Sequence, residues 1–515
     1  MFRGITAKSV STFGTELVSG RRRAFFLSFL VGFVVRLIPE VLLSPYPIGF
    51  DSFFYAWRIK SSVIWYHWSQ VFSTWLLYAI LIPLYNVARL DLFVFVKLTA
   101  ALLFGFNACG IYYFARKALG WTIKKGLLAS VFFSLQLAAL TFSSNFYRGM
   151  LGLGILLFTL PLIKDDFRSM RQVLVFMGLS IFVVLGHELS SVVLFSVFLG
   201  FLASRILKGK DLRALKRLIA VFPALALVAI SLCLWVFPTP YEVQENRILV
   251  YEPTGNYQGA LFFFKNYLGV YETIQYAPRY LDLASQIFSL FAFSYIVALP
   301  LVIVGFFRDN VLDSWTGLLL IGSLGALVMP FFALDQWWRW MLMLVYPFTF
   351  YAVNGITRIL RSSREAVGSV FKQVKWTKFT ERVVKLILIL PFSIGLVLMP
   401  TVMQGTAVPL SDVDDTMKAL QWLDSQMDDD SILLTHTAFL FLAEFYLDAS
   451  HTRVHFKDEI KGAINLALQH EFQNVYFVWW IENRGWYGLT VPRDFVSVFS
   501  SGRMSVFKYY GSGTT

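Results

Sequence analysis

The amino-acid sequence predicts an α-helical polytopic membrane protein of about eleven transmembrane helices, followed by a small C-terminal α/β domain outside the membrane. Hydrophobic residues make up 57% of the 515 residues and charged residues only 15%, whereas soluble globular proteins average about 45–50% and about 25%. The apolar residues form runs long enough to cross a bilayer, which takes about 20 residues. The polar residues concentrate in residues 404–515. This pattern excludes a soluble enzyme of this size and a disordered chain.

The formal net charge of +13 is unevenly distributed along the chain. Residues 404–515 hold 8 Lys and Arg against 14 Asp and Glu, a net charge of −6, so the apolar part carries +19. A nucleic-acid-binding protein would carry its basic residues on a polar domain, but the polar domain here is acidic. We therefore expect no nucleic-acid partner and interpret the basic excess as a signal of membrane orientation.

Eleven spans follow from the apolar runs. They lie near 24–44, 92–114, 127–143, 150–163, 172–186, 189–205, 218–237, 286–306, 316–333, 341–358 and 384–402. The apolar segment 71–88 could be a further span or an interfacial helix. Without it as a span, 27 of the 37 basic residues of the apolar part face the cytosol. Counting it as a span would turn most of those residues outward, against the positive-inside rule. We therefore expect a multi-pass cell-membrane protein with a cytoplasmic N-terminus and an extracytoplasmic C-terminal domain.

This topology divides the chain into a transmembrane module, residues 1–403, and an extracytoplasmic α/β domain, residues 404–515. The module has outer loops at 45–91 and 238–285, and a basic cytosolic loop at 358–385 that we expect to lie along anionic lipid. In the domain, hydrophobic patterning predicts helices at 412–427 and 437–447 and strands at 431–436, 474–480 and 504–510.

Ionisable residues are scarce inside the spans, and the main exceptions are Arg36 and Glu40. Their i, i+4 spacing places them on one helix face, where they can pair. We interpret them as a structural ion pair near the outer end of the first span. A coupled transporter would more often carry carboxylates near the membrane midplane, so their scarcity disfavours that function.

Polar residues gather instead at the outer ends of the spans, first in SPYPIGFDSFFYAWRIK (44–60). Two prolines end the helix, and Asp51 precedes the next one. On that helix Asp51 and Tyr55 share a face, with Arg58 nearby. One interpretation is a substrate site, and the other is a capping aspartate on an interfacial helix.

Three further outer turns carry candidate residues: Asn145 and Arg148, then His187 and Glu188, then Trp337, Trp338 and Arg339. The His–Glu turn could transfer protons or be a simple polar turn. Arg339 could bind a lipid phosphate or anchor an aromatic belt at the interface. If they converge, the candidates suit chemistry on a lipid-phosphate-linked substrate at the outer leaflet. Asp51 would be the base for an acceptor hydroxyl, and the cations would stabilise the leaving phosphate.

The segment GFDSFFYAWRIK (49–60) resembles the first-loop signature of archaeal and eukaryotic oligosaccharyltransferase catalytic subunits, where a D-x-D pair precedes an aromatic stretch and a basic residue. The chain is similar to the GT-C superfamily of polytopic glycosyltransferases, which includes oligosaccharyltransferases, protein O-mannosyltransferases and aminoarabinose transferases. Those proteins have one span, a long outer loop that opens with an acidic residue, and many further spans. RWMLMLVYPFTFYAVNGI (339–356) resembles members in which an Arg before a Pro-containing helix faces the lipid phosphate.

The sequence also departs from the oligosaccharyltransferase pattern. Asp51 corresponds to the second Asp of the pair, and the first is Gly49; SNFYRGMLG (144–152), at the place of the second acidic motif, has no carboxylate. A hard divalent cation wants several oxygen ligands. The resemblance therefore favours a metal-independent monosaccharide transferase without a cofactor, although the turn at 187–188 could restore a metal ligand. VWWIEN (478–483) is only superficially similar to the WWDYG motif, and we interpret it as a buried strand end.

The resemblance implies an inverting glycosyltransferase that takes a sugar from a polyprenyl- or dolichyl-phosphate donor at the outer face and delivers it to an unidentified acceptor. Two other functions stay open. A lipid or glycan transporter, or flippase, would move its substrate without covalent transfer. A non-catalytic membrane scaffold would bind partners through its tail, and its outer polar residues would not converge.

Overall fold

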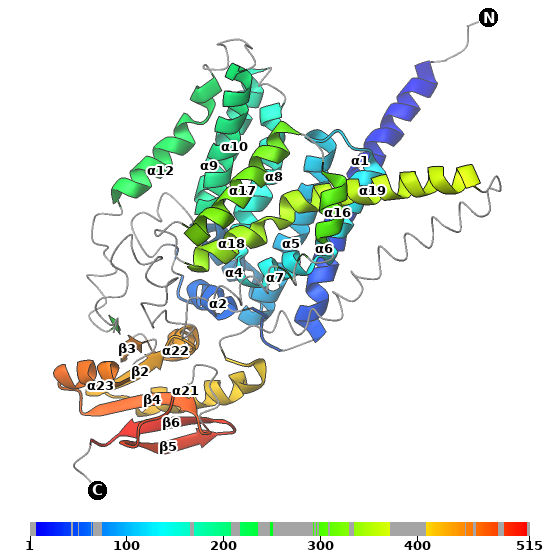
Figure 1. The fold of residues 1–515 in the computed structure, drawn as a ribbon. Helices are drawn as coiled ribbons and strands as arrows, with labels where there is room; N and C mark the ends of the chain where they lie inside the picture. The colour runs from blue at the N-terminus through cyan, green and yellow to red at the C-terminus, as the bar shows by residue number, and fades with distance from the viewer. Residues whose placement is uncertain are drawn as a thin grey trace, which may run out of the picture.

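The structure is a computed structural model. It describes residues 7–42, 45–49, 51–62, 64, 75–164, 169–207, 217–234, 248–250, 292, 295, 298–306, 309–328, 334–370, 408–448, 450–456, 460–482 and 489–511. The predicted span 384–402, most of the predicted outer loop 238–285 and most of the basic loop 358–385 lie outside these residues. The described part consists of a helical bundle with a small sheet domain beside it (Figure 1).

The bundle contains helices at every predicted span that the described residues cover. Its long helices are α1 (Ala7–Leu42), α5 (Leu92–Lys117), α6 (Ile123–Leu135), α7 (Leu137–Asn145), α8 (Tyr147–Lys164), α9 (Met170–Gly186), α10 (Glu188–Leu207), α12 (Phe222–Leu234), α16 (Ala298–Gly305), α17 (Asn310–Val328), α18 (Leu334–Met343) and α19 (Val345–Val370). Two further helices, α2 (Ser52–Lys60) and α4 (Leu76–Ala88), lie at the end of the bundle nearest the sheet domain (Figure 1).

Among the described helices, three are long and apolar enough to cross a membrane unaided: Arg22–Leu42, Leu92–Lys117 and Glu188–Leu207. The helices α6 and α7, bent by 63° at the break between them, are long and apolar enough only as a pair, which fits a broken span or a re-entrant loop. The break falls at Gln136, whose backbone is extended and whose side-chain amide donates to Thr349 Oγ1 at 2.8 Å. The predicted total of eleven spans remains a prediction.

The segment 71–88, which we expected to be an interfacial helix, contains α4 at Leu76–Ala88. The helix has 13 residues, about 20 Å at 1.5 Å per residue, which is shorter than the ~30 Å hydrocarbon core. It ends at Arg89, whose backbone is left-handed (φ 49°). The length of α4 therefore agrees with an interfacial position.

Helices α1 and α5 cross at close range because small residues face each other. A Cβ placed on Gly32 would lie 2.6 Å from Ala108 Cβ, and one on Gly105 would lie 2.8 Å from the Phe29 carbonyl oxygen. In a membrane no hydrophobic driving force brings helices together, so close packing at small residues stabilises such crossings. The crossing fixes the first span, and with it the start of the first outer loop, against the rest of the bundle.

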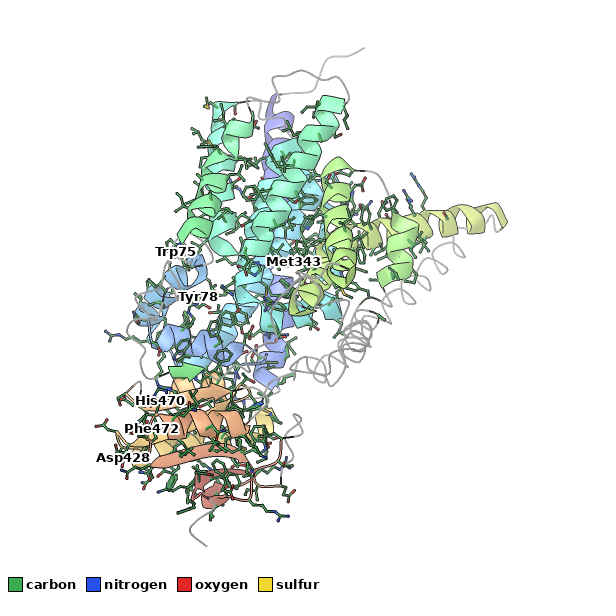
Figure 2. All side chains as sticks on the ribbon, turned by 60° about the vertical axis from the view of Figure 1, so that its left-hand side comes forward. Trp75, Tyr78, Met343, Asp428, His470 and Phe472 are labelled. Carbon is green, nitrogen blue, oxygen red and sulfur yellow. The ribbon has the colours of Figure 1, made fainter. Side chains whose placement is uncertain are left out.

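The sheet domain has six strands in the order β1-β3-β2-β4-β6-β5. They are β1 (Ile248–Val250), β2 (Ser431–His436), β3 (Thr452–Phe456), β4 (Asn474–Trp480), β5 (Phe495–Ser501) and β6 (Met504–Tyr509). The first four strands in that order are parallel, and the last two pair antiparallel. The helices are α21 (Val413–Gln426), α22 (Leu440–Tyr446) and α23 (Ile460–Gln469). In Figure 2, Asp428, His470 and Phe472 lie together at one end of this domain, where the loops before β2 and β4 meet.

The predicted helices and strands of the tail are present, but β3, α23 and β5 were not predicted. One strand comes from elsewhere in the chain: β1 belongs to the predicted outer loop 238–285 and pairs in parallel with β3. This pairing places part of that loop and the tail on the same side of the bundle, while the N-terminus lies at the opposite end (Figure 1). The interpretation of VWWIEN as a buried strand end is confirmed for Trp479 and Trp480, which end β4 and are buried.

Candidate active site

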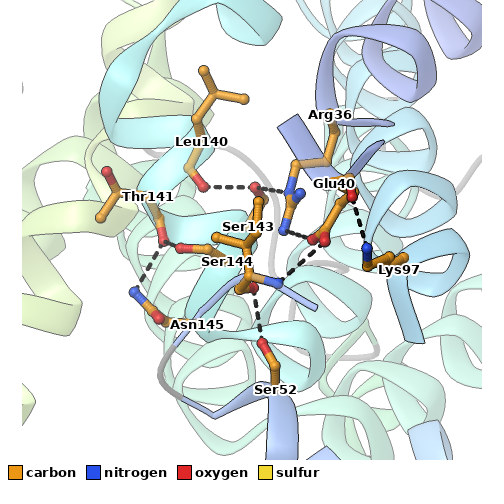
Figure 3. Close-up of polar contacts among 10 residues, drawn as sticks. Arg36, Glu40, Ser52, Lys97, Leu140, Thr141, Ser143, Ser144 and Asn145 are labelled. Carbon is orange, nitrogen blue, oxygen red and sulfur yellow. Dashed lines mark hydrogen bonds and ion pairs between the residues drawn. The ribbon is translucent and has the colours of Figure 1, made fainter. Parts of the chain in front are cut away.

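A buried ion pair lies beneath the first outer loop. Arg36 Nη2 is 2.7 Å from Glu40 Oε1, and both side chains are 0% exposed. Arg36 Nε also donates to Ser143 Oγ at 2.8 Å, and the Ile48 amide donates to Glu40 Oε2 at 3.1 Å. Figure 3 shows these contacts together with the 2.8 Å bond from Lys97 Nζ to the Glu40 carbonyl. Because its partners are protein groups on several elements, the pair is structural, as the spacing predicted.

Gly49 holds the loop against the junction of α7 and α8. Its φ is +122°, a backbone conformation that side chains disfavour. A Cβ at this position would lie 1.8 Å from the Ser144 carbonyl oxygen. The position that corresponds to the first Asp of the D-x-D pair therefore has no room for a carboxylate in this backbone.

Asp51 occupies the N-cap position of α2, but its side chain makes no capping hydrogen bond. The interpretation of Asp51 as a capping aspartate is therefore wrong. Its carboxylate is half-buried and interacts electrostatically with Arg339 and, more weakly, with Arg148. Burial raises the pKa of Asp51 to about 6, although the two guanidinium groups oppose that rise. The group is thus a carboxylate of near-neutral pKa, which suits a general base.

The predicted cations interact with Asp51 from two other helices, and the His–Glu turn interacts with both cations. Arg148, in the first turn of α8, interacts electrostatically with both Asp51 and Glu188. Arg339, on α18, interacts with Asp51, and its guanidinium carbon lies 5.3 Å from the centre of the Phe146 ring. His187 and Glu188 also face both arginines.

The members of this cluster differ in exposure. The Glu188 side chain is 49% exposed, whereas that of His187, whose Nε2 is 3.8 Å from Glu188 Oε1, is 7% exposed. Arg148 and Arg339 are half-buried. The carboxylates and guanidinium groups therefore remain accessible to a ligand. Electrostatic interactions connect Asp51 and the His187–Glu188 turn through Arg148 and Arg339. That these residues form one substrate site stays a prediction.

Two stacked tyrosines, one on α2 and one on α8, lie close to Asp51 and Arg148 in the chain. The Tyr55 and Tyr147 rings are parallel within 1° at 4.4 Å between centres. The Tyr55 hydroxyl accepts from the Tyr147 amide at 3.1 Å and donates to the Asn145 carbonyl at 3.4 Å. Because Tyr55 is only 3% exposed, it fixes the start of α8 and does not face a ligand. These hydrogen bonds give Tyr55 a positioning role, and its direct contact with a substrate stays a prediction.

Arg58 is likewise enclosed by protein groups, and its contact with a substrate also stays a prediction. It is 2% exposed, its guanidinium carbon lies 3.7 Å from the centre of the Tyr78 ring, and its Nη2 donates to the Ile64 carbonyl at 2.5 Å. This cation–π contact joins α2 to α4. Tyr78, labelled in Figure 2, also interacts electrostatically with Arg148. Sequence reasoning missed Tyr78 and Tyr147, although one lies in the apolar segment 71–88 and the other is next to Arg148.

The remaining candidates are Asn145, Trp337 and Trp338. Asn145 ends α7 and is half-buried, and its side-chain amide donates to the Thr141 carbonyl at 3.3 Å. Trp337 and Trp338 belong to α18 together with Arg339, but their side chains lie outside the described residues. Within the described part of the chain, no group of three or more His, Cys, Asp or Glu side chains is arranged to hold a metal ion.

The fold is similar to that of several solved membrane transferases. ArnT from Cupriavidus metallidurans, bound to undecaprenyl phosphate, matches 94% of this chain and 98% of its own, with a TM-score of 0.50 and 13% identity. The apo oligosaccharyltransferase of Archaeoglobus fulgidus matches 90% of this chain and 69% of its own, with a TM-score of 0.54 and 10% identity. The mycobacterial arabinofuranosyltransferase AftD matches 96% of this chain but only 40% of its own, with a TM-score of 0.53 and 11% identity.

These similarities cover 90–96% of the chain and agree with the predicted fold: the chain shares the fold of these transferases. No protein-family model matches the sequence. No curated protein matches it either. At 10–13% identity the similarity concerns the fold, so the function has to be argued from the side chains of the site.

Proposed function

We propose that this protein is a membrane glycosyltransferase. It takes a sugar from a polyprenyl- or dolichyl-phosphate donor at the outer face of the cell membrane and transfers it to an acceptor hydroxyl. The observation that carries the proposal is the uncapped, half-buried carboxylate of Asp51 facing the two arginines Arg148 and Arg339. An anionic donor and a nucleophile that must lose a proton need this combination of groups.

The proposed reaction assigns each group a role. The acceptor oxygen attacks the anomeric carbon of the sugar, and Asp51 takes the proton of the acceptor hydroxyl. The bond between the anomeric carbon and the phosphate oxygen breaks, and its electron pair leaves with the lipid phosphate. Arg339 and Arg148 stabilise the charge that develops on that phosphate. Attack on the face opposite to the leaving group inverts the anomeric configuration.

The turn at His187 and Glu188 completes the site. The exposed Glu188 carboxylate is an acceptor for sugar hydroxyls, and its attraction to Arg148 orients that guanidinium. The ArnT structure that shares this fold was solved with undecaprenyl phosphate bound, which supports a polyprenyl-phosphate ligand for the same kind of bundle. The two arginines of this chain supply the donors such a phosphate needs.

Transfer by the purified protein tests the proposal. The full chain in detergent is incubated with radiolabelled polyprenyl-phosphate sugars and candidate acceptors, and labelled product is measured. We expect Asp51→Asn to lower kcat roughly 10²- to 10⁴-fold, as for loss of a general base, while Asp429→Asn on the exposed loop before β2 leaves it unchanged. Full activity in Asp51→Asn would show that another group is the base.

The arginines are tested in the same assay. Replacing Arg148 or Arg339 by Ala should raise KM for the donor and lower kcat, because both the ground state and the departing phosphate carry negative charge. Arg205→Ala is the matched control, since Arg205 lies in the last turn of α10 and contacts Phe201. A donor that moves across vesicle membranes without any transfer would favour the transporter function instead.

A further inference from the structure

The loop that carries Asp51 has a second set of contacts, with the C-terminal domain and the start of α5. Tyr46 and Phe53, which flank Asp51 in sequence, are buried in the hydrophobic core of the C-terminal domain. Their ring centres are 6.2 Å apart and lie 5.5 Å and 5.8 Å from the ring of Phe93 on α5, which in turn lies 5.4 Å from the Phe445 ring of the tail. The first outer loop is therefore part of the tail domain's core as well as of the bundle.

A polar contact completes this attachment. The Tyr46 hydroxyl donates to Asp414 Oδ1, and Asp414 lies in the first turn of α21. Tyr46 is 8% exposed, so this hydrogen bond lies at the edge of the apolar cluster. A hydrogen bond to a charged group is stronger than one between neutral groups, and here it joins residues that are far apart in sequence.

The helix after Asp51 is held by the same domain. Lys60 Nζ donates to the Phe445 carbonyl at 2.6 Å, and its ammonium lies 4.5 Å from the centre of the Phe445 ring. The Phe54 ring lies 4.9 Å from that of Phe441. Both phenylalanines belong to α22, which lies between the sheet and α2 (Figure 1). Both ends of α2 are thus attached to the tail.

The bundle alone fixes only one face of the loop. On that face Ile48 is bound through Glu40, and Gly49 lies against Ser144. Asp51 has no capping hydrogen bond of its own. The position of its carboxylate relative to Arg148 and Arg339 therefore depends on the contacts with the bundle and on those with the tail; we call the contacts with the tail the clamp. A displacement of 1 Å at a catalytic group can lower the rate about a hundredfold.

We propose that Tyr46 and Asp414 are positioning residues through which the C-terminal domain holds the catalytic loop in place, so that the tail is an obligatory part of the active site. The proposal rests on the proposed role of Asp51. It predicts that loosening the tail changes kcat more than donor binding, because the donor-binding arginines lie on α8 and α18 and not on the clamped loop.

The kinetic test is a double-mutant cycle on the full chain with Tyr46→Phe and Asp414→Asn. Each single variant should lower kcat roughly ten- to a hundredfold with KM for the donor nearly unchanged. The double variant should lose no more than the worse single variant, because the two residues act through one contact. Tyr46→Phe keeps the ring in the core, so the protein should retain its thermal unfolding midpoint within a few degrees.

Two matched controls lie elsewhere in the same domain. Tyr509→Phe removes a hydroxyl from β6, and Asp429→Asn removes a charge from the exposed loop before β2. Both should transfer at the wild-type rate. Multiplicative losses in the double variant, or a loss confined to KM, would overturn the proposal.

Amide hydrogen exchange separates failure of this inference from failure of the proposed function. In the wild type, peptides covering residues 45–53 should be protected; in Asp414→Asn their exchange should accelerate, while peptides from α5 stay protected. This readout needs no substrate. Unchanged exchange at 45–53 would overturn the clamp whatever the transfer assay gives. If exchange at 45–53 is faster in Asp414→Asn but the wild type shows no transferase activity, the clamp is supported and the proposed glycosyltransferase function is rejected.

Discussion

The ionisation of Asp51 should set the lower pH limit of sugar transfer. Only the carboxylate form accepts a proton, and burial raises the pKa of Asp51 from 3.8 to about 6. The rate should therefore fall as the pH drops through about 6. One pH unit lower, about one tenth of the molecules carry an ionised Asp51, so kcat/KM should be about tenfold below its plateau, with a slope of one.

Replacing either arginine should shift the pKa of Asp51 and with it the lower pH limit of transfer. Arg339 is the stronger of the two charges that oppose the rise in the Asp51 pKa. Replacing Arg339 by Gln removes that opposition, so the pKa should rise further and the acid limb of the profile should move to higher pH. Arg148→Gln should move it in the same direction by less. Arg205→Gln, at the far end of α10, should leave the limb where it is.

The assay is kcat/KM for a radiolabelled donor between about pH 4.5 and 8, with the unfolding midpoint measured at each pH. The position of the limb is read independently of the plateau, which the arginine variants also lower. A limb near 4, the ordinary value for Asp, would refute the argument from burial. A limb that moves to lower pH in Arg339→Gln would refute the electrostatic assignment, and its loss in His187→Gln would assign it to the imidazole.

Three further predictions concern the loop around Asp51. Gly49→Ala should lower both activity and the unfolding midpoint, because a Cβ there would lie 1.8 Å from the Ser144 carbonyl oxygen; differential scanning fluorimetry measures the shift, and wild-type stability would contradict the tight loop. Glu40→Gln should destabilise by roughly 3–5 kcal/mol, because it leaves Arg36 charged and buried without its carboxylate; the exposed Glu471→Gln is the control in chemical unfolding. Transfer should persist in excess EDTA, because Gly49 leaves one carboxylate where a hard cation needs several oxygen ligands; activity restored only by Mg²⁺ or Mn²⁺ would contradict it.

Much of the bundle could be predicted because its elements depend on local composition. Apolar runs mark helices that must satisfy their own backbone hydrogen bonds in lipid. In the tail, NVYFVWW was recognisable as a strand because it is a continuous run of valines and aromatic residues. In the structure this run is β4, and every residue after Asn474 is buried. By contrast, β3 has the sequence TRVHF. Its Arg453 is buried beside Glu444 of α22, at 3.3 Å, and donates to the Asp448 carbonyl at 3.1 Å, and these partners follow from the fold.

The candidate site was predictable in outline and not in detail. Polar residues at the outer ends of spans were expected to lie near one another, because those ends are on the same predicted side of the membrane. Which of them face a ligand depends on the rotation of each helix and on long-range pairing. Arg58 turned out to stack on Tyr78, and β1 joined the tail from a loop that lies far from β3 in sequence. Neither contact leaves a periodic signal.

Two carboxylates on either side of one turn show how the fold separates structure from chemistry. Glu40 has its oxygens bound by Arg36 and the Ile48 amide, is 0% exposed and holds the loop. Asp51 follows shortly after, in the position where an aspartate usually caps a helix, yet the backbone turns its carboxylate toward Arg148 and Arg339. A capping bond would stabilise α2 by about 1 kcal/mol. The chain forgoes that stabilisation at Asp51 while it pairs Glu40 with Arg36 and the Ile48 amide, a combination expected of a group kept available for a reaction.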